Sequence, residues 1–425
     1  MKVLIVNTSE KTGGAAVAAN RLMEALINNG VKAKMLVRDK QSDRLTVASL
    51  PQTPLLRWHF LWERLVIYIY SFFSKKHLFD IDIANAGTDI TKLPEFKEAD
   101  VIHLHWINQG MLSLKDIRKI LQSGKPVVWT MHDIWPATAI CHYTRGCNQF
   151  KTQCNACPLL PKFSPLNHKA AGVWQKKQHM LQDSSIYFSA CSRWLEGEAR
   201  KSALLKDQSI TNIPNPIDTH IFHPLASKAE ARKKLGLPEE GNILLFVSQK
   251  VTDERKGVVF FTKAISILAE THPMFKENTT IAILGGHADE VAQQLALPTK
   301  ALGYVSDEKT IISAYNAANV FVTPSLEDNL PNTIMEAMAC GTPCVGFRVG
   351  GIPEMIDHQK NGYVAEFRSA EDLANGINWV LNDADYDALC QHAIRKVAQN
   401  YSQSSVALRY IEVYQHAIAQ KRFKL

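Results

Sequence analysis

Short apolar runs alternate with longer amphipathic stretches through the first half of the chain. Helical spacing of apolar residues marks the stretches between them, such as 15–29 and 114–122. Apolar runs without polar alternation are typical of strands buried on both faces, and strands that alternate with helices form parallel sheets. The pattern therefore predicts an α/β fold with a helix-covered parallel sheet. The predicted strands are residues 3–6, 34–37, 101–104, 127–131 and 186–190.

The alternation stops at Pro214-Asn215-Pro216 and then starts again. Two prolines around one asparagine cannot continue a helix or a central strand, so we expect a linker there. We predict a Rossmann-like domain at 1–214, a second at 215–400, and a helix at 401–425 that returns to the first. Open parallel sheets bind ligands at the carboxyl ends of their strands, so we expect a cleft there. The later predicted strands are 243–247, 280–284, 320–323 and 343–347, with helices at 257–270, 307–317 and 332–340.

Composition narrows the class of protein but does not choose a ligand. The 425 residues are 46% hydrophobic and 21% charged, which is typical of an ordinary soluble globular protein. A net charge of +7 suits any anionic partner. The first residues lack the pattern of a signal peptide, and no run of eighteen apolar residues is present. We therefore expect a cytoplasmic protein.

Candidate ligand-binding residues of the first half lie at strand ends. Gly13 and Gly14 follow the first predicted strand and precede a helix, where backbone N–H groups can meet an anion; a simple tight turn is the alternative. His103 and His105 end one strand, where capping the sheet edge is the favoured role. His132 ends the next strand and is better placed to contact a ligand.

The second half repeats this arrangement with charged residues. Lys250 follows a predicted strand, and Lys256 precedes the next helix, so the two cations suit a diphosphate; a solvated basic turn is equally compatible. Asp328 lies in a loop and Glu336 within the following helix. A carboxylate can accept hydrogen bonds from two neighbouring sugar hydroxyls. A glycine-rich turn follows at 346–351.

Taken together, these motifs resemble glycosyltransferase family 4, the retaining group with the GT-B fold of two Rossmann-like domains. The likeness spans almost the whole chain and is most specific in the second half. The residues that carry it are Gly13-Gly14-Ala15, His132, Lys250, Lys256-Gly257, Pro324-Ser325, Asp328, Glu336 through Pro343, Gly350 through Glu354, Asn361-Gly362, and Asn215 through Asp218 of the linker.

The resemblance implies a role for each matching residue. Gly13 and Gly14 match the loop that approaches the donor diphosphate, and His132 matches the histidine beside the transferred sugar and the acceptor. Lys256 matches the phosphate-binding lysine. Lys250 stands where an arginine is usual, which exchanges a bidentate fork for a point charge.

Four further positions fall in the donor-binding region. Glu336 matches the acid that holds the ribose hydroxyls. Asp328 stands where the family usually has a glutamate beside the donor sugar, so the shorter side chain puts the sugar's identity in question. Asn329 and Leu330 replace the small glycine-bearing turn that is common before Glu336.

The resemblance implies a retaining transfer from a UDP- or GDP-linked sugar to a glycan or lipid-linked acceptor in surface polysaccharide assembly. Catalysis would rest on stabilising the leaving diphosphate in a water-poor cleft, without a divalent metal or other cofactor. Two alternatives stay open: a GT-B epimerase acting on the nucleotide sugar itself, and a non-catalytic zinc-bearing interaction protein. Nucleic acid is not an expected partner, because the basic residues form no recognised nucleic-acid motif.

Four cysteines, Cys141, Cys147, Cys154 and Cys157, fall within seventeen residues. Only the last two have a spacing typical of metal ligands, so a structural zinc, disulfides and free thiols all stay open. The segment resembles an insertion in an exopolysaccharide branch of the family, such as the colanic acid-type enzymes.

Residues 55–76 mix aromatic and basic side chains. This composition suits a membrane interface, and peripheral contact would serve a lipid-linked acceptor. A helix buried in the core is the alternative. The aromatic residues are Trp58, Trp62, Tyr68, Tyr70, Phe72 and Phe73, and the cations are Arg57, Arg64, Lys75 and Lys76.

Overall fold

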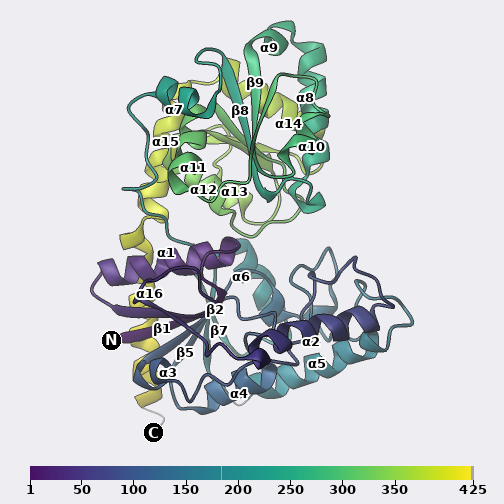
Figure 1. Ribbon diagram of the computed structural model, residues 1–425, viewed down its shortest axis with the longest axis vertical. Helices are drawn as coiled ribbons and strands as arrows, with labels where there is room; N and C mark the ends of the chain where they lie inside the picture. The colour runs from purple at the N-terminus through teal and green to yellow at the C-terminus, as the bar shows by residue number, and fades with distance from the viewer. Residues whose placement is uncertain (183, 423–425) are drawn as a thin grey trace. The chain divides into compact units, whose positions relative to one another are not determined.

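The computed structural model describes residues 1–182 and 184–422. The chain divides into two compact units (Figure 1). Unit 1 comprises Met1–Pro216 together with the C-terminal segment from Gln403, and unit 2 comprises Ile217–Ser402.

Unit 1 contains a seven-stranded sheet in which every strand pairs in parallel with its neighbours. The strand order is β3-β2-β1-β4-β5-β6-β7, so the order reverses beside β1. The strands are β1 (Lys2–Ser9), β2 (Lys32–Asp39), β3 (Val47–Ser49), β4 (Val101–Leu104), β5 (Val127–Met131), β6 (Ile186–Ala190) and β7 (Ser209–Asn212). The helices are α1 (Gly14–Asn28), α2 (Pro54–Tyr70), α3 (Pro94–Glu98), α4 (Leu114–Gln122), α5 (Pro165–Gln182), α6 (Arg193–Arg200) and α16 (Gln403–Arg422).

Alternate residues of β1 enter two different hydrophobic cores, one on each face of the sheet. Val3 and Ile5 pack in a core shared with α1 and α16, whereas Leu4 and Val6 pack in the larger core of the opposite face. This is the geometry expected when successive side chains point to opposite faces of a strand. The continuous apolar run of β1 is therefore required, because both faces are covered.

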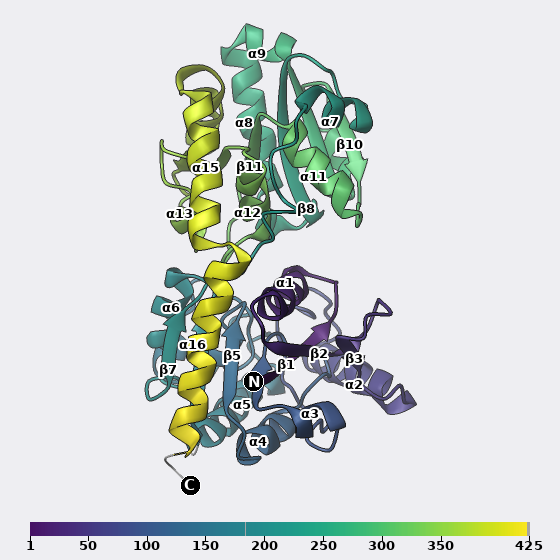
Figure 2. The ribbon, with the colours of Figure 1, turned by 90° about the vertical axis from the view of Figure 1, so that its left-hand side faces the viewer.

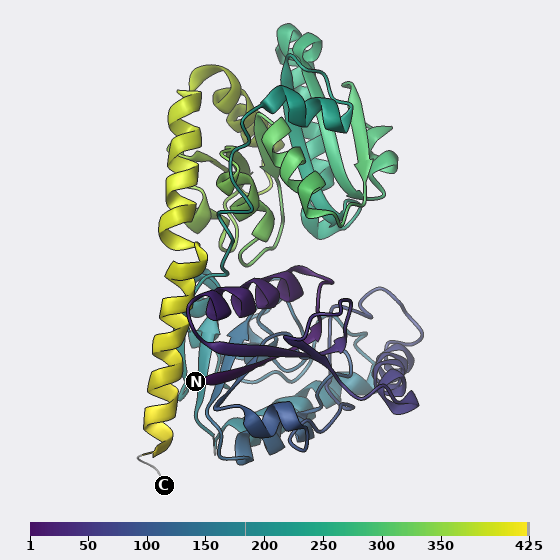
Figure 3. The ribbon, with the colours of Figure 1, turned by 60° about the vertical axis from the view of Figure 1, so that its left-hand side comes forward.

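The C-terminal helix α16 belongs to unit 1 although it is the last element of the chain. It contacts α1 and β5, and Figures 2 and 3 show it running along the sheet of unit 1. Tyr410 and Tyr414 on this helix are fully buried. Their hydroxyl groups enter the hydrogen-bond network described below.

Unit 2 contains a six-stranded parallel sheet in the order β10-β9-β8-β11-β12-β13. Its strands are β8 (Asn242–Lys250), β9 (Thr279–Gly286), β10 (Thr299–Gly303), β11 (Val320–Thr323), β12 (Cys344–Phe347) and β13 (Gly362–Ala365). Its helices are α7 (Lys228–Leu235), α8 (Val258–Thr271), α9 (Pro273–Asn278), α10 (Ala288–Ala292), α11 (Glu308–Ala317), α12 (Asn332–Ala339), α13 (Ile352–Met355), α14 (Ala370–Asn378) and α15 (Tyr386–Asn400).

The predicted α/β class with parallel sheets is confirmed, and each predicted strand is present. Four strands escape the sequence pattern, namely β3, β7, β10 and β13. All four lie at the edges of their sheets, β3 and β7 in the first sheet and β10 and β13 in the second. Each has only three to five residues and no continuous run of large apolar side chains, so the sequence pattern does not mark it.

Candidate active sites of the two units

In unit 2, two cations face a carboxylate where the chain leaves β8 and β11. A short 3-10 turn, Glu254–Lys256, precedes α8, and the loop after β11 carries Asp328. Lys256 Nζ lies 2.7 Å from Asp328 Oδ2, and Arg255 Nη1 lies 3.8 Å from the same oxygen. The structure thus brings Lys256 and Asp328 together and adds Arg255, which we had not chosen as a site residue.

Two glycines allow these loops to approach one another. Gly257 has φ 70°, and a Cβ built there would lie 1.8 Å from the carbonyl oxygen of Pro324. Gly350 has φ 56°, and its Cβ would lie 1.7 Å from the carbonyl oxygen of Asp328. Any other residue would therefore displace the loop that carries the carboxylate. These contacts give a physical reason for the glycines at the starts of α8 and α13.

The Asp328 carboxyl group is ionised despite its burial. Burial opposes ionisation, but Lys256 and Arg255 outweigh it and lower the pKa of Asp328. Asn329 and Leu330 beside it are also buried. The site therefore presents a fixed negative charge between two cations, which can accept sugar hydroxyls while the cations meet an anion.

Glu336 lies on α12 and is buried, with 8% of its surface exposed. Its Oε2 accepts a hydrogen bond from the hydroxyl group of Tyr315 at 2.8 Å. Tyr315, on α11, is fully buried, so its hydrogen bond restrains the orientation of this carboxylate. Sequence reasoning missed Tyr315, because nothing in its local pattern distinguishes it from a core aromatic residue.

Lys250 is the outlier among the predicted donor-site residues. It ends β8, is exposed, and forms no ion pair within the described part of the chain. The structure therefore groups Arg255 and Lys256 with Asp328, while Lys250 stands in solvent at the strand end.

In unit 1, Gly13 and Gly14 join β1 to α1. Gly13 has φ 94°, and a Cβ built there would meet nothing within 4 Å. The backbone conformation, rather than crowding by protein atoms, thus requires glycine. The open space leaves the N-terminus of the fifteen-residue helix α1 accessible on this side.

His132 follows β5 and is held at both ring nitrogens. Its Nε2 lies 2.9 Å from Nδ1 of His105, and its Nδ1 lies 3.6 Å from the sulfur of Cys191. The Cys191 thiol donates to Oδ1 of Asn215 at 3.1 Å. These contacts hold the His132 ring between His105 and the Cys191–Asn215 pair.

His103 and His105 do not cap the sheet edge as expected. Both are buried, and His103 bonds to Tyr414 and Thr130, each at 2.7 Å. Burial lowers the pKa of His132 to about 4 and that of His103 to about 3. Both histidines are therefore neutral at neutral pH. His132 can offer a hydrogen bond or an apolar ring edge to a ligand, but it carries no positive charge.

Asp133, the residue after His132, belongs to a buried charged network that the sequence pattern does not predict. Asp133 accepts hydrogen bonds from His142 at 2.7 Å and from the indole of Trp106 at 3.0 Å. His142 also bonds to Asp82 at 2.6 Å, and Asp82 pairs with Arg64. Burial lowers the pKa of His142, but Asp133 and Asp82 outweigh it and raise that pKa to about 10.

Helix α2 is oriented with charged residues inward and aromatic residues outward. Glu63 and Arg64 are buried, whereas Trp58 and Trp62 are 53% and 42% exposed. Leu56 and Ile67 pack in the large core of unit 1, so the core-helix alternative holds for part of this segment, while Trp58 and Trp62 stay outside the core. The exposed apolar residues are Leu55, Trp58, Leu61, Trp62, Leu65, Ile69, Phe72, Phe73 and Phe79.

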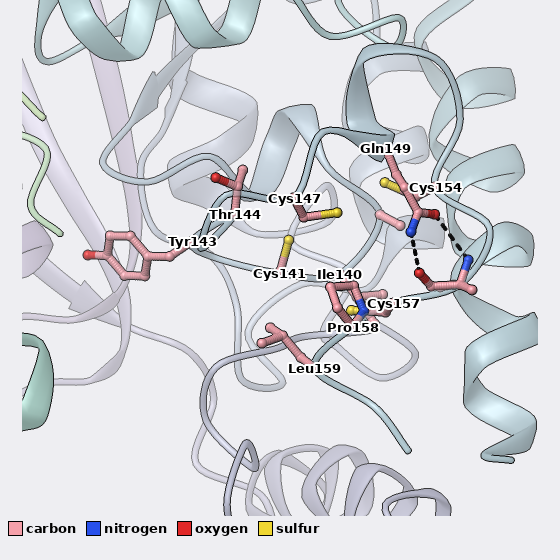
Figure 4. A pocket seen from close by; sticks show the side chains of 13 residues that line it. Ile140, Cys141, Tyr143, Thr144, Cys147, Gln149, Cys154, Cys157, Pro158 and Leu159 are labelled. Atoms are coloured by element: carbon pink, nitrogen blue, oxygen red, sulfur yellow. Dashed lines mark hydrogen bonds between the residues drawn. The ribbon is translucent and has the colours of Figure 1, made fainter. Parts of the chain in front are cut away.

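The four clustered cysteines line one pocket of unit 1 (Figure 4). All four are free thiols. As the side chains stand, no three histidine, cysteine, aspartate or glutamate residues of the described chain are arranged to hold a metal ion. Nor is any helix among the described residues both long and apolar enough to cross a membrane.

Solved structures share the fold over nearly the whole chain. Sucrose-phosphate synthase from Thermosynechococcus elongatus aligns with a TM-score of 0.69 at 19% identity, covering 99% of this chain and 100% of that one. Anabaena HepE, solved with UDP and glucose, aligns with a TM-score of 0.63 at 17% identity, covering 98% and 100%. The two parallel-sheet units and these neighbours identify the fold as GT-B.

Sequence comparisons identify the family. The model for Glycosyltransferase Family 4 matches residues 12–221, and the model for glycosyl transferases group 1 matches residues 227–398. An uncharacterized glycosyltransferase from Methanocaldococcus jannaschii is 28% identical over 370 residues, covering 80% of this chain and 90% of that protein. D-inositol 3-phosphate glycosyltransferase from Saccharomonospora viridis is 25% identical over 225 residues, which is 50% of this chain and 52% of that enzyme. The chain is therefore a glycosyltransferase, and the two matches together support family 4.

Proposed function

We propose that this glycosyltransferase moves a sugar, with retention at the anomeric carbon, from a UDP- or GDP-linked donor to a glycan or lipid-linked acceptor in surface polysaccharide assembly. The observation that carries the proposal is the cluster of Arg255, Lys256 and Asp328 in unit 2, with Glu336 held by Tyr315. The solved HepE complexes with UDP and UDP-glucose support a nucleotide-sugar donor for the fold.

The proposed donor site divides the work between charges of opposite sign. Lys256 and Arg255 meet the diphosphate and stabilise it as it leaves, without a divalent metal. Glu336 accepts hydrogen bonds from the two ribose hydroxyls. Asp328 turns from Lys256 toward the donor sugar when the diphosphate takes over that cation. Lys250 lies at the strand end, and its flexible side chain contacts the phosphate once the donor is bound.

In unit 1, we propose that His132 acts on the transferred sugar and the acceptor as a neutral hydrogen-bonding group. With a pKa of about 4, it is a poor proton carrier at neutral pH. Such a role suits a front-face transfer, in which the leaving diphosphate itself can accept the acceptor's proton.

The exposed face of α2 provides the proposed contact with the cytoplasmic side of a membrane. Among residues 54–79, the acid Glu63 is buried, whereas Arg57, Lys75 and Lys76 are exposed. The outward charges are thus all positive, and they accompany aromatic side chains that suit the interface of an anionic bilayer. Each buried aromatic contributes roughly 1–3 kcal/mol, so a few suffice for reversible binding.

Donor binding and product analysis test the proposed reaction. Calorimetry with UDP- and GDP-sugars should give tight binding to one base only, weakened in Lys256→Met and unchanged in the surface variant Glu366→Gln. Nuclear magnetic resonance of the product should show the donor's anomeric configuration. An inverted product would refute retention, and a nucleotide sugar altered at another carbon without acceptor would favour the epimerase.

Sedimentation with anionic vesicles tests the membrane face. We expect a variant with serine at Trp58, Trp62, Phe72 and Phe73 to stay folded, to leave the vesicle pellet, and to keep its affinity for the donor. The matched control places serine at the exposed apolar residues of unit 2, Val259, Met274 and Tyr304. Equal sedimentation of the two variants and the parent would eliminate this face as the membrane contact.

A further inference from the structure

A second site lies in unit 1 and has no part in the proposed sugar transfer. Four cysteine side chains from separate turns line one pocket with about 350 Å³ of space outside the protein atoms, open solvent included. Cys141 forms an isolated antiparallel bridge with Ile81, and Cys147 follows the turn at Arg145-Gly146, where both residues have positive φ. Cys154 and Cys157 follow the 3-10 turn Gln149–Lys151. Figure 4 shows the four cysteine side chains among the residues that line this pocket.

We propose that these four cysteines bind one structural zinc ion. Structural zinc takes four protein ligands in tetrahedral geometry, and thiolates are its preferred sulfur ligands. In this structure, the described thiols are not arranged as ligands of a single ion. Rotation about χ1 moves a cysteine sulfur between staggered positions without moving the backbone, so the ion can draw them together from the walls that they already line.

A buried lysine favours a negatively charged zinc–thiolate cluster over a pair of neutral disulfides. Lys177 is about 1% exposed, and its Nζ donates to the carbonyl oxygens of Trp135 at 2.6 Å and Thr138 at 3.0 Å. It lies 3.3 Å from the centre of the Trp135 ring. Among the described residues, Lys177 forms no ion pair. Burying a cation without an anion is costly, so this position calls for nearby negative charge.

The acids of this region are already committed to other cations. Asp133 bonds to His142, and Asp82 bonds to both His142 and Arg64. Four thiolates around Zn²⁺ carry a net charge of two minus, whereas two disulfides are neutral. Thr138 connects the lysine to the cluster directly, because its carbonyl accepts from Lys177 and its hydroxyl donates to the carbonyl of Cys141 at 2.7 Å.

The segment that carries the four cysteines has little regular secondary structure, so a bound metal ion could stabilise it. Between β5 and α5, the chain forms only two 3-10 turns, Trp135–Ala137 and Gln149–Lys151, and otherwise loops. Ile140, Phe150 and Leu160 anchor this loop-rich segment in the large core of unit 1, and a metal can add folding free energy where regular secondary structure is lacking.

Elemental analysis of the full chain, purified with a reductant, provides the test. We expect close to one zinc per chain in the parent and in Cys390→Ser, a control in unit 2, but loss of zinc in Cys147→Ser and Cys157→Ser. Lys177→Met keeps all four thiols. We expect it to weaken zinc affinity about 10- to 100-fold in competition with a chelator, as happens when a residue that supports the metal ligands is changed.

Cobalt replacement covers the case in which a cysteine variant fails to fold. Cobalt bound to the parent should give the intense visible bands of a tetrahedral tetrathiolate complex. A parent that stays metal-free after zinc addition, a pale cobalt spectrum, or alkylation showing two disulfides would each overturn the proposal. Sugar transfer that is unaffected by zinc removal would leave the proposed function intact, so the two proposals fail separately.

Discussion

Replacing Glu336 should separate its role in donor binding from its role in the fold. The carboxylate accepts a hydrogen bond of 2.8 Å from Tyr315, which is fully buried. From the sequence alone, Glu336→Ala is expected to abolish donor binding and spare the fold. The structure revises that expectation, because alanine also removes the acceptor that Tyr315 uses.

The size of both effects follows from the hydrogen bonds involved. A hydrogen bond to a charged group contributes about 1.5–3 kcal/mol, and each kcal/mol shifts the melting temperature of a domain the size of unit 2 by about 2–4 °C. Glu336→Ala should therefore melt roughly 3–12 °C lower. Glu336→Gln keeps an acceptor oxygen for Tyr315, so we expect it to melt close to the parent.

Donor affinity should respond differently. Losing two hydrogen bonds from ribose hydroxyls to a carboxylate costs about 3–6 kcal/mol, which is a fall of roughly 150- to 25,000-fold in affinity. We expect Glu336→Gln to lose a large part of that affinity while it stays folded, and Tyr315→Phe to lose stability more than affinity. Calorimetry with the nucleotide and a melting curve on the same samples measure both. A folded Glu336→Gln variant with the parent's affinity would refute the assignment.

Three other substitutions test separate steps of the reasoning. His132→Ala should lower turnover far more than donor affinity, and the parent's pH–rate profile should lack an inflection near 6.5 due to this residue, because its folded pKa is about 4. Gly350→Ala should weaken donor binding and lower the melting temperature more than Gly303→Ala, because both have positive φ but only Gly350 would bring a Cβ against backbone. The stability difference between the parent and His142→Gln should be full below pH 6.5 and disappear as pH rises toward 10, since a raised folded pKa stabilises only the protonated form. A difference that grows with pH would show that His142 is buried neutral.

The sequence predicts the fold well because each buried parallel strand consists of a continuous run of mostly apolar residues. Val127–Met131 is buried at every position, and its pattern contains no polar residue except Thr130. The edge strands follow no such rule. Val47–Ser49 pairs on one side only, and two of its three residues are partly exposed, so this strand is too short and too weakly buried to leave an apolar signature.

Site residues can be predicted from sequence where a strand end and a charge coincide, as at His132 and Lys256. Their partners cannot. Tyr315 and Glu336 lie twenty-one positions apart, and His103 reaches Tyr414 across 311 positions. Nothing in the spacing of these residues indicates contact, because the sheet topology alone brings α11 beside α12 and α16 beside the first sheet.

Helix α2 illustrates the limit most clearly, since its hydrophobic pattern indicates an amphipathic helix but not which face turns inward. The usual assumption places the aromatic face in the core, yet Glu63 and Arg64 occupy that position. Glu63 accepts hydrogen bonds from the backbone of Ile83 at 3.0 Å and Ala84 at 2.7 Å, while Arg64 pairs with Asp82. These contacts compensate for burying the charges, and Asp82 extends them to His142 and Asp133 beside His132. The same charged network that orients α2 therefore supports the strand end bearing His132, so turning the aromatic face outward and holding the proposed catalytic histidine have one structural cause.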